Sequence, residues 1–138
     1  MKKKGCRNAL IILAIIVVLI AGAIAIFVYK SNQGFEKLSA LTIENVDLTM
    51  IPNGEYLGDY EVFPISVEVK VTVTNHQMSD ISILKHVNGQ GGPAEGIIDT
   101  VLEKQSLEVD AVTGATYSSK VILKSIEDAL LSANEKHL

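Results

Sequence analysis

Hydroxyl and carboxylate side chains gather in one short segment, residues 110–119, which reads Asp-Ala-Val-Thr-Gly-Ala-Thr-Tyr-Ser-Ser. The pattern predicts an extended piece that ends at Asp110, a tight turn through Gly114 and a helix that begins near Thr116. The first N–H groups of a helix have no intrahelical partners and carry the positive end of the helix dipole. Two interpretations follow: a Thr or Ser hydroxyl caps the helix, or the helix start binds an anion such as a phosphate.

The sequence lacks the residue patterns of other common functional sites, such as metal centres and nucleotide-binding loops. The three histidines, His76, His86 and His137, are scattered, and no cluster of His, Cys and carboxylates has metal-ligand spacing. The chain holds neither a Walker loop nor a GxGxxG fingerprint. The one cysteine is Cys6, so the region after residue 30 forms no disulfide. We therefore predict neither a catalytic residue nor a metal ligand.

The elements that must position the 110–119 segment follow from the hydrophobic periodicity. Ile65 to Thr74 alternates strictly between apolar and polar residues, which is typical of a half-buried antiparallel strand. The predicted elements are strands at 46–50, 55–60, 65–74 and 80–87 and helices at 94–104 and 116–134. This order predicts an α+β fold, an antiparallel sheet with two helices in the C-terminal half of the chain.

The N-terminal region contains 21 consecutive uncharged residues, Ala9 to Tyr29. A helix of this length spans about 31 Å, close to the ~30 Å hydrocarbon core of a bilayer. Four basic residues precede the run: Lys2, Lys3, Lys4 and Arg7. By the positive-inside rule the N-terminus is cytoplasmic and the rest of the chain lies outside. A cleaved signal peptide is the alternative, but its apolar part is usually only about 7–15 residues long.

These features divide the chain into four parts. They are a cytoplasmic tail at 1–8, a single transmembrane signal-anchor helix at 9–29, a stalk at 30–45 and an extracytoplasmic domain at 46–138. The chain after residue 30 holds seven Lys against sixteen Asp and Glu, a net charge of −9. An acidic domain of this kind argues against nucleic acid and anionic lipid surfaces as partners.

The segment Asp110 to Thr116, D-A-V-T-G-A-T, resembles the flavinylation motif Asp-x-x-(Ser/Thr)-Gly-Ala-Thr of the FMN-binding domain family. That family includes domains in the C subunit of the sodium-translocating NADH:quinone reductase and in the G subunit of the related ferredoxin:NAD oxidoreductase complex. It also includes many small membrane-anchored proteins. Residues 53–58, Asn-Gly-Glu-Tyr-Leu-Gly, look like the family's opening Asp-Gly-x-Tyr-x-Gly, with Asn53 in place of Asp. The resemblance extends over about residues 46–133.

The resemblance implies a covalently attached cofactor. In this family the last threonine of the motif, here Thr116, is joined through its hydroxyl oxygen to the phosphate of FMN as a phosphoester. A separate flavin transferase installs the FMN outside the cytoplasm, with FAD as the donor. Tyr117 either stacks on the flavin ring or belongs to the core. The cofactor-binding residues implied around Thr116 are Asp110, Thr113, Gly114, Ala115, Tyr117 and Ser118.

A second contact with the flavin is predicted from the glycine-rich segment before the first helix. The larger subunits of the family carry a Glu-Thr-Pro-Gly-type stretch near the flavin ring, and residues 89–93, Gly-Gln-Gly-Gly-Pro, take its place here. Backbone N–H groups at Gly91 and Gly92 either meet the ring or belong to a flexible connection. His86, just before this loop, either touches the flavin or is an ordinary strand histidine.

The leading hypothesis is a membrane-anchored, extracytoplasmic flavoprotein that carries electrons between redox partners and is not itself an enzyme. Its expected partners are the flavin transferase and an electron donor and acceptor in or outside the membrane. Nucleic acid is not an expected partner. Two alternatives remain open: a non-redox binding or assembly module of the same fold, and a flavin-dependent reductase of a small-molecule acceptor.

Overall fold

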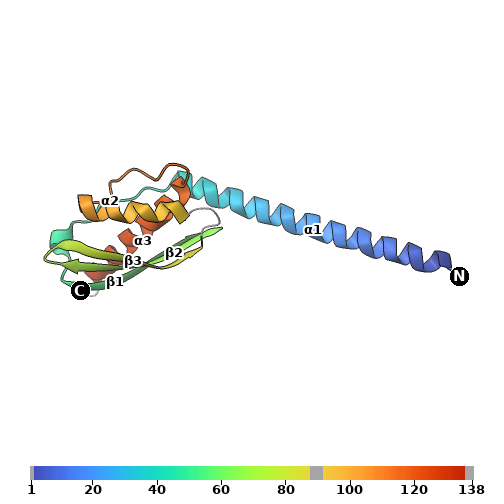
Figure 1. Cartoon of the computed structure of the whole chain (residues 1–138), viewed down its shortest axis with the longest axis horizontal. Coiled ribbons are helices and arrows are strands. Elements are labelled where there is room, and N and C mark those ends of the chain that lie inside the picture. Colours follow the sequence, from blue (N-terminus) through green and yellow to red (C-terminus); the bar gives the residue numbers. More distant parts are fainter. Residues whose placement is uncertain (1, 88–91, 136–138) are drawn as a thin grey trace. The chain divides into compact units, whose positions relative to one another are not determined.

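The computed structural model describes residues 2–87 and 92–135 of the chain. The chain divides into two compact units, Met1–Gln33 and Gly34–Leu138. Helix α1 (Lys2–Ser39) fills the first unit and has its last turns in the second (Figure 1). Its stretch Arg7–Ser39 is long and apolar enough to cross a membrane, a test of length and composition that N-terminal signal sequences also pass.

A three-stranded antiparallel sheet forms one layer of the second unit, in the order β1 (Gly54–Val62), β2 (Ile65–Thr74) and β3 (Gln77–Val87). The central strand β2 coincides with the strand predicted at 65–74. Its apolar residues are at most 4% exposed, and they are Ile65, Val67, Val69, Val71 and Val73. The alternation of the sequence thus places one apolar face of the sheet against the rest of the unit.

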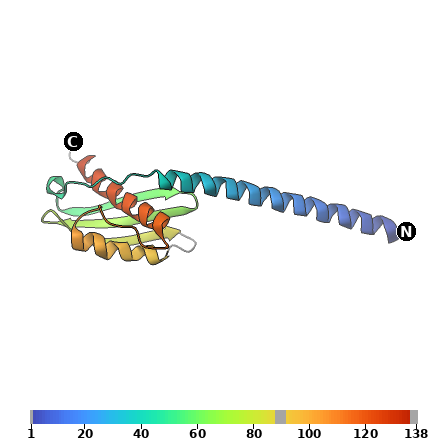
Figure 2. The same cartoon turned by 90° about the horizontal axis from the view of Figure 1, so that it is seen from above.

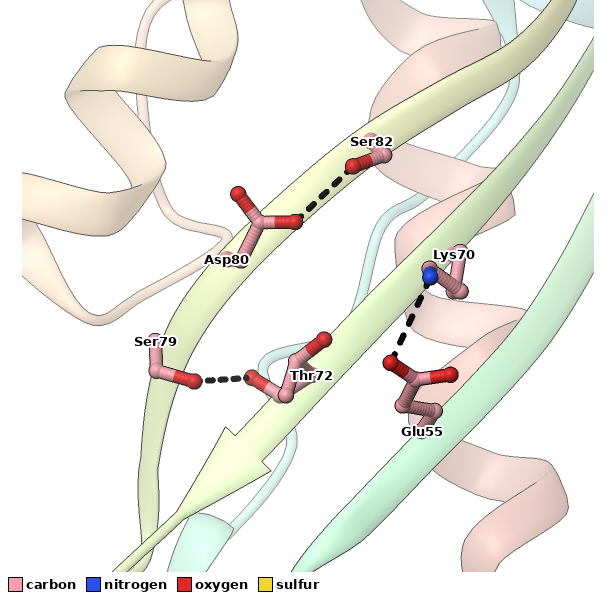
Figure 3. Close-up of polar contacts among 6 residues, drawn as sticks. All are labelled: Glu55, Lys70, Thr72, Ser79, Asp80 and Ser82. Carbon is pink, nitrogen blue, oxygen red and sulfur yellow. Dashed lines mark hydrogen bonds and ion pairs between the residues drawn. The ribbon is translucent and has the colours of Figure 1, made fainter.

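The outer face of the sheet carries mainly polar side chains (Figure 3), together with the exposed Leu57. Lys70 Nζ pairs with Glu55 Oε1 across β1 and β2 at 3.3 Å. On β3, Ser82 Oγ donates a hydrogen bond to Asp80 Oδ2 at 2.8 Å. Helix α3 (Thr116–Glu135) lies behind the sheet in this view, on the apolar side. Any functional site built from the helices therefore lies on the inner face of the sheet or at its ends.

Helices α2 (Ile97–Lys104) and α3 cover the inner face of the sheet (Figures 1 and 2). Helix α3 contacts β1 and β2, and α2 contacts β3. The α3 residues that the periodicity predicts to face inward are all buried: Ile122, Ile126, Ala129, Leu130 and Ala133. The predicted helix at 94–104 consists of a 3-10 turn, η2 (Gly92–Gly96), followed by α2. The α+β fold with its helices in the C-terminal half is confirmed.

Gly58 allows α3 to cross β1 closely. A Cβ atom at this position would overlap the carbonyl oxygen of Ser125 and the backbone nitrogen of Ala129. Two residues earlier, Tyr56 is buried, and its hydroxyl donates a hydrogen bond to the carbonyl oxygen of Pro52 at 2.9 Å. Packing of the core therefore explains the glycine and the tyrosine of the 53–58 segment.

The strand predicted at 46–50 is wrong, because Leu48–Met50 forms a 3-10 turn, η1. The carboxylate of Asp47 accepts hydrogen bonds from the backbone N–H of Thr49 at 2.9 Å and from its hydroxyl at 2.7 Å. These two hydrogen bonds lower the pKa of the Asp47 carboxyl below its ordinary value, and the bond from the Thr49 side chain has the larger effect. Short-range bonds of this type offer the backbone an alternative to strand pairing.

Residues 34–45 pack on the sheet and helices of the second unit. Leu38, near the end of α1, is fully buried in the core cluster of the second unit. Further along, the side-chain oxygen Oδ1 of Asn45 accepts a hydrogen bond from the backbone N–H of Leu107 at 3.1 Å. The compact unit of the structure begins at Gly34, whereas the sequence pattern predicts that the domain starts at residue 46.

Candidate functional site

The turn that precedes α3 has the conformation that the sequence predicts. Gly114 has a φ of 80°, in the left-handed region that favours glycine. The N–H of Ala115 donates a hydrogen bond to the carbonyl oxygen of Val112 at 3.0 Å, which closes the turn. Helix α3 then begins at Thr116. The motif therefore forms a tight turn directly before a helix start.

Ser119 holds this turn in place. Its hydroxyl is fully buried, accepts a hydrogen bond from the N–H of Val112 at 3.0 Å and donates one to the carbonyl oxygen of Ala115 at 2.9 Å. The sequence alone assigned no role to Ser119. The sequence does contain a signal for this role. Ser119 is a hydroxyl residue in the first helical turn after the Gly114 turn, where such side chains commonly bond to nearby backbone groups.

The hydroxyl of Thr116 is exposed and unpaired at the first position of α3. Within the described part of the chain, neither Thr116 nor Thr113 forms a side-chain hydrogen bond. The backbone N–H of Ser119 donates to the Ala115 carbonyl, just before the helix, at 2.9 Å. An α-helix leaves the N–H groups before this point without partners. The described residues thus offer the geometry of an anion site and show no Thr113 or Thr116 cap.

Lys120 adds a positive charge one turn after Thr116, on the same side of α3. Its Nζ donates hydrogen bonds to the carbonyl oxygens of Leu38 at 2.9 Å and Ser39 at 3.1 Å, the last residues of α1. The C-terminal carbonyls of a helix lack intrahelical partners, and lysine side chains commonly satisfy them. Lys120 therefore connects the end of α1 to the first turns of α3.

An aromatic pair lies beside the Lys120 contact. The rings of Phe35 and Tyr117 stack with their centroids 4.8 Å apart and their planes inclined by 29°. Tyr117 is 38% exposed and Phe35 is partly buried against the core. The ring of Tyr117, directly after Thr116, thus packs on α1 and is also open to solvent.

The other predicted residues of the motif divide between surface and core. Asp110, Thr113 and Gly114 are exposed, so they lie on the same accessible turn as Thr116. Ala115 and Ser118 are buried, and their small side chains face the domain. The turn thus presents its polar residues outward.

Turn η2 (Gly92–Gly96), directly before α2, lies at the same end of the unit as the start of α3 (Figures 1 and 2). Turn η2, which begins with the exposed Gly92, contacts α3. Gly91 lies outside the described residues. Before it on β3, the Nδ1 atom of His86 is 2.9 Å from Glu95 Oε1 of η2. One end of the fold therefore brings together three parts of the predicted flavin site: the 110–116 motif, the residues after the glycine-rich loop, and His86.

Comparison with known families identifies the domain. Residues 64–131 match the family model of the FMN-binding domain, from the start of β2 through most of α3 and including the whole 110–116 motif. The Gly34–Leu138 unit therefore belongs to the FMN-binding domain family. No curated protein and no solved structure matched the chain.

The residues present fit an FMN. A phosphate is favoured where the first turn of α3 exposes its N–H groups beside Lys120. A buried side-chain nitrogen without a partner in the described residues, His86 Nε2, offers a polar contact for a further group of the ligand. In the described part of the chain, no three His, Cys, Asp or Glu side chains are grouped so as to hold a metal ion.

Proposed function

We propose that this chain is a membrane-anchored flavoprotein that carries FMN covalently on Thr116 and transfers electrons between redox partners outside the cytoplasm. The observation that carries the proposal is the side chain of Thr116, which is exposed at the first residue of α3 and has no hydrogen-bond partner among the described residues, within an FMN-binding domain. Helix α1 is the anchor, with the N-terminus in the cytoplasm.

The surroundings of Thr116 suit a phosphoester. The negative phosphodiester lies beside the N–H groups and the positive dipole end of α3, with the Lys120 ammonium one turn away. Gly114 and Ala115 present no bulky side chain next to the hydroxyl. When bound, the flavin accepts electrons from a donor and returns them to an acceptor, while the protein holds and orients it.

Attachment requires access for a flavin transferase and a donor, FAD. The Thr116 oxygen forms a bond to the phosphorus on the FMN side of the FAD pyrophosphate, the bond to AMP breaks, and AMP leaves as the hydroxyl gives up its proton. Asp110 and Thr113 are exposed on the same turn, where the transferase would recognise them. The covalent bond keeps the flavin on a protein outside the cell, where a dissociated cofactor would be diluted.

An electron carrier agrees better with this site than a substrate-specific enzyme. The attachment turn is exposed, and the neighbouring Tyr117 is 38% open to solvent. A flavin held on an exposed turn readily exchanges electrons with a docking partner. Such exchange does not require a closed pocket that holds a small substrate beside the flavin.

Intact-mass measurement tests the attachment. The chain is produced with and without a flavin transferase, as wild type, Thr116→Ala, Thr116→Ser and Thr100→Ala. We expect wild type and the Thr100→Ala control to gain the mass of FMN less water and to show in-gel flavin fluorescence. Thr116→Ala should gain neither, whereas Thr116→Ser keeps a hydroxyl. Wild type that stays unmodified beside an active transferase, or a fluorescent Thr116→Ala, would contradict the proposal.

Orientation and redox function are tested on the loaded protein. Protease added to intact spheroplasts should remove the flavin-bearing domain. Full protection of that domain would contradict the proposed orientation and place the domain in the cytoplasm. Reduction by dithionite and reoxidation by ferricyanide should be complete and repeatable. A loaded protein whose flavin does not cycle with these small probes would favour the non-redox alternative.

A further inference from the structure

His86 points into the layer between the sheet and the helices. It pairs with Val67 across β2 and β3, and directly opposed residues of antiparallel strands project from the same face. Val67 is 1% exposed on the inner face, and its carbonyl oxygen accepts a hydrogen bond from the hydroxyl of Ser125 on α3 at 3.3 Å. The His86 side chain is accordingly only 4% exposed, although it lies near the end of β3.

The two ring nitrogens of His86 have different surroundings. Nδ1 lies 2.9 Å from Glu95 Oε1, and because a carboxylate only accepts hydrogen bonds, Nδ1 carries the proton. Nε2 is buried and has no hydrogen-bond partner in the described part of the chain. Buried polar atoms without a partner are rare in native proteins, so this nitrogen is suited to meet a group from outside the chain. Glu95 therefore orients the ring with an unprotonated, acceptor nitrogen directed away from it in the neutral form.

The position of His86 relates it to the attachment threonine. Glu95 belongs to η2, which contacts α3, and η2 lies with the start of α3 at one end of the unit (Figure 2). The ribityl chain of FMN separates the flavin ring from the phosphate on Thr116. The ring is therefore held at a distance from the threonine, and its pyrimidine edge carries an N–H donor between two carbonyl groups. A single acceptor nitrogen in a buried position is complementary to that N–H.

We propose that His86 binds the pyrimidine edge of the flavin ring through Nε2, and that Glu95 acts as a positioning residue that fixes the imidazole tautomer. This inference rests on the proposed attachment of FMN to Thr116. It assigns ring binding to β3 and η2, whereas the phosphate is held by α3. The flavin is then fixed at both ends, which orients the ring toward a redox partner.

Nitrogen NMR on the full-length chain in detergent tests the contact directly. Histidine is labelled with 15N, the His86 signals are assigned with His86→Gln, and loaded wild type is compared with the unloaded Thr116→Ala variant. We expect the Nε2 shift of His86 to differ between the two proteins and the shifts of the exposed His76 to agree. Intact mass reports loading independently. Identical His86 shifts in fully loaded and unloaded protein would overturn the contact while leaving the attachment intact, whereas an unloaded wild type would overturn both.

Variants test what the contact does to the flavin. Loaded His86→Leu and His86→Gln, with loading verified by intact mass, should show a displaced flavin absorption band and midpoint potential. His76→Gln is the matched control and should change neither quantity. Glu95→Ala should reproduce part of the shift because Nδ1 loses its acceptor, and Glu95→Gln should restore wild-type values because its amide oxygen still accepts. A loaded His86→Leu with the wild-type spectrum and potential would overturn the proposal.

Discussion

The ring of Phe35, from the last turns of α1, stacks on the ring of Tyr117, the residue directly after Thr116. Lys120 strengthens the same junction through its hydrogen bonds to the carbonyl oxygens of Leu38 and Ser39. Phe35, Leu38 and Ser39 therefore belong to the same compact unit as the FMN-binding domain. The start of α3 is held from the sheet side and from α1.

Removing the aromatic ring at residue 35 should loosen this junction. Phe35→Ala is expected to lower the free energy of unfolding of the Gly34–Leu138 unit by about 1–2 kcal/mol, because a stacked pair and part of its apolar burial are lost. Phe35→Leu keeps an apolar side chain and should lose less. Thermal unfolding of the full chain in detergent, followed by near-ultraviolet circular dichroism, measures both. Equal stability of Phe35→Ala and wild type would show that the stack contributes nothing.

Loss of the Ser119 hydroxyl should specifically disturb the turn at residues 112–115, which precedes Thr116. Ser119→Ala leaves the Val112 N–H without its acceptor and should cost about 1–3 kcal/mol of stability. It should also slow flavin attachment, measured as mass gain against time beside the transferase, because the turn no longer holds Thr116 in one geometry.

Ser125→Ala is the matched control for Ser119→Ala. Ser125 is also fully buried on α3 and donates to the carbonyl oxygen of Val121 at 2.8 Å, more than two turns after the motif. It should lose comparable stability and load at the wild-type rate. If the two variants slow loading equally, the effect of Ser119 is one of general stability and the positioning role is refuted.

The left-handed backbone at Gly114 should make this position intolerant of a side chain. Gly114→Ala has space for its methyl group, so its expected cost of about 1–2 kcal/mol comes from the backbone conformation alone. Gly96→Ala is the comparison, since Gly96 has a φ of −61° and equally open surroundings. It should be neutral or stabilising by up to about 1 kcal/mol. Chemical denaturation measures the change in the free energy of unfolding of each variant relative to wild type. Equal changes for the two variants would contradict a conformational cost at Gly114.

Regular elements were predictable where a local pattern and the tertiary structure agree. The period of two in 65–74 specifies one apolar face, and β2 occupies those residues. The helix start at Thr116 follows from glycine and hydroxyl residues before an apolar stripe. The alternation at 46–50 is misleading, because two short-range hydrogen bonds from Thr49 to Asp47 favour a turn there. Three apolar residues at alternate positions carry too little information to outweigh these two bonds.

By itself, the sequence determined the elements whose signals repeat along neighbouring residues: the apolar run of α1, the central strand, the C-terminal helices and the motif that ends at Thr116. The tertiary structure alone decided which hydroxyl holds the turn, that Phe35 stacks on Tyr117 and that His86 is buried with Glu95 on one nitrogen. The physical reason is the range of the interactions. Periodicity and turn chemistry act over a few residues, whereas these contacts join different elements, and the stack and the Lys120 bonds join segments more than 80 residues apart. Such contacts exist only after the sheet and helices have packed.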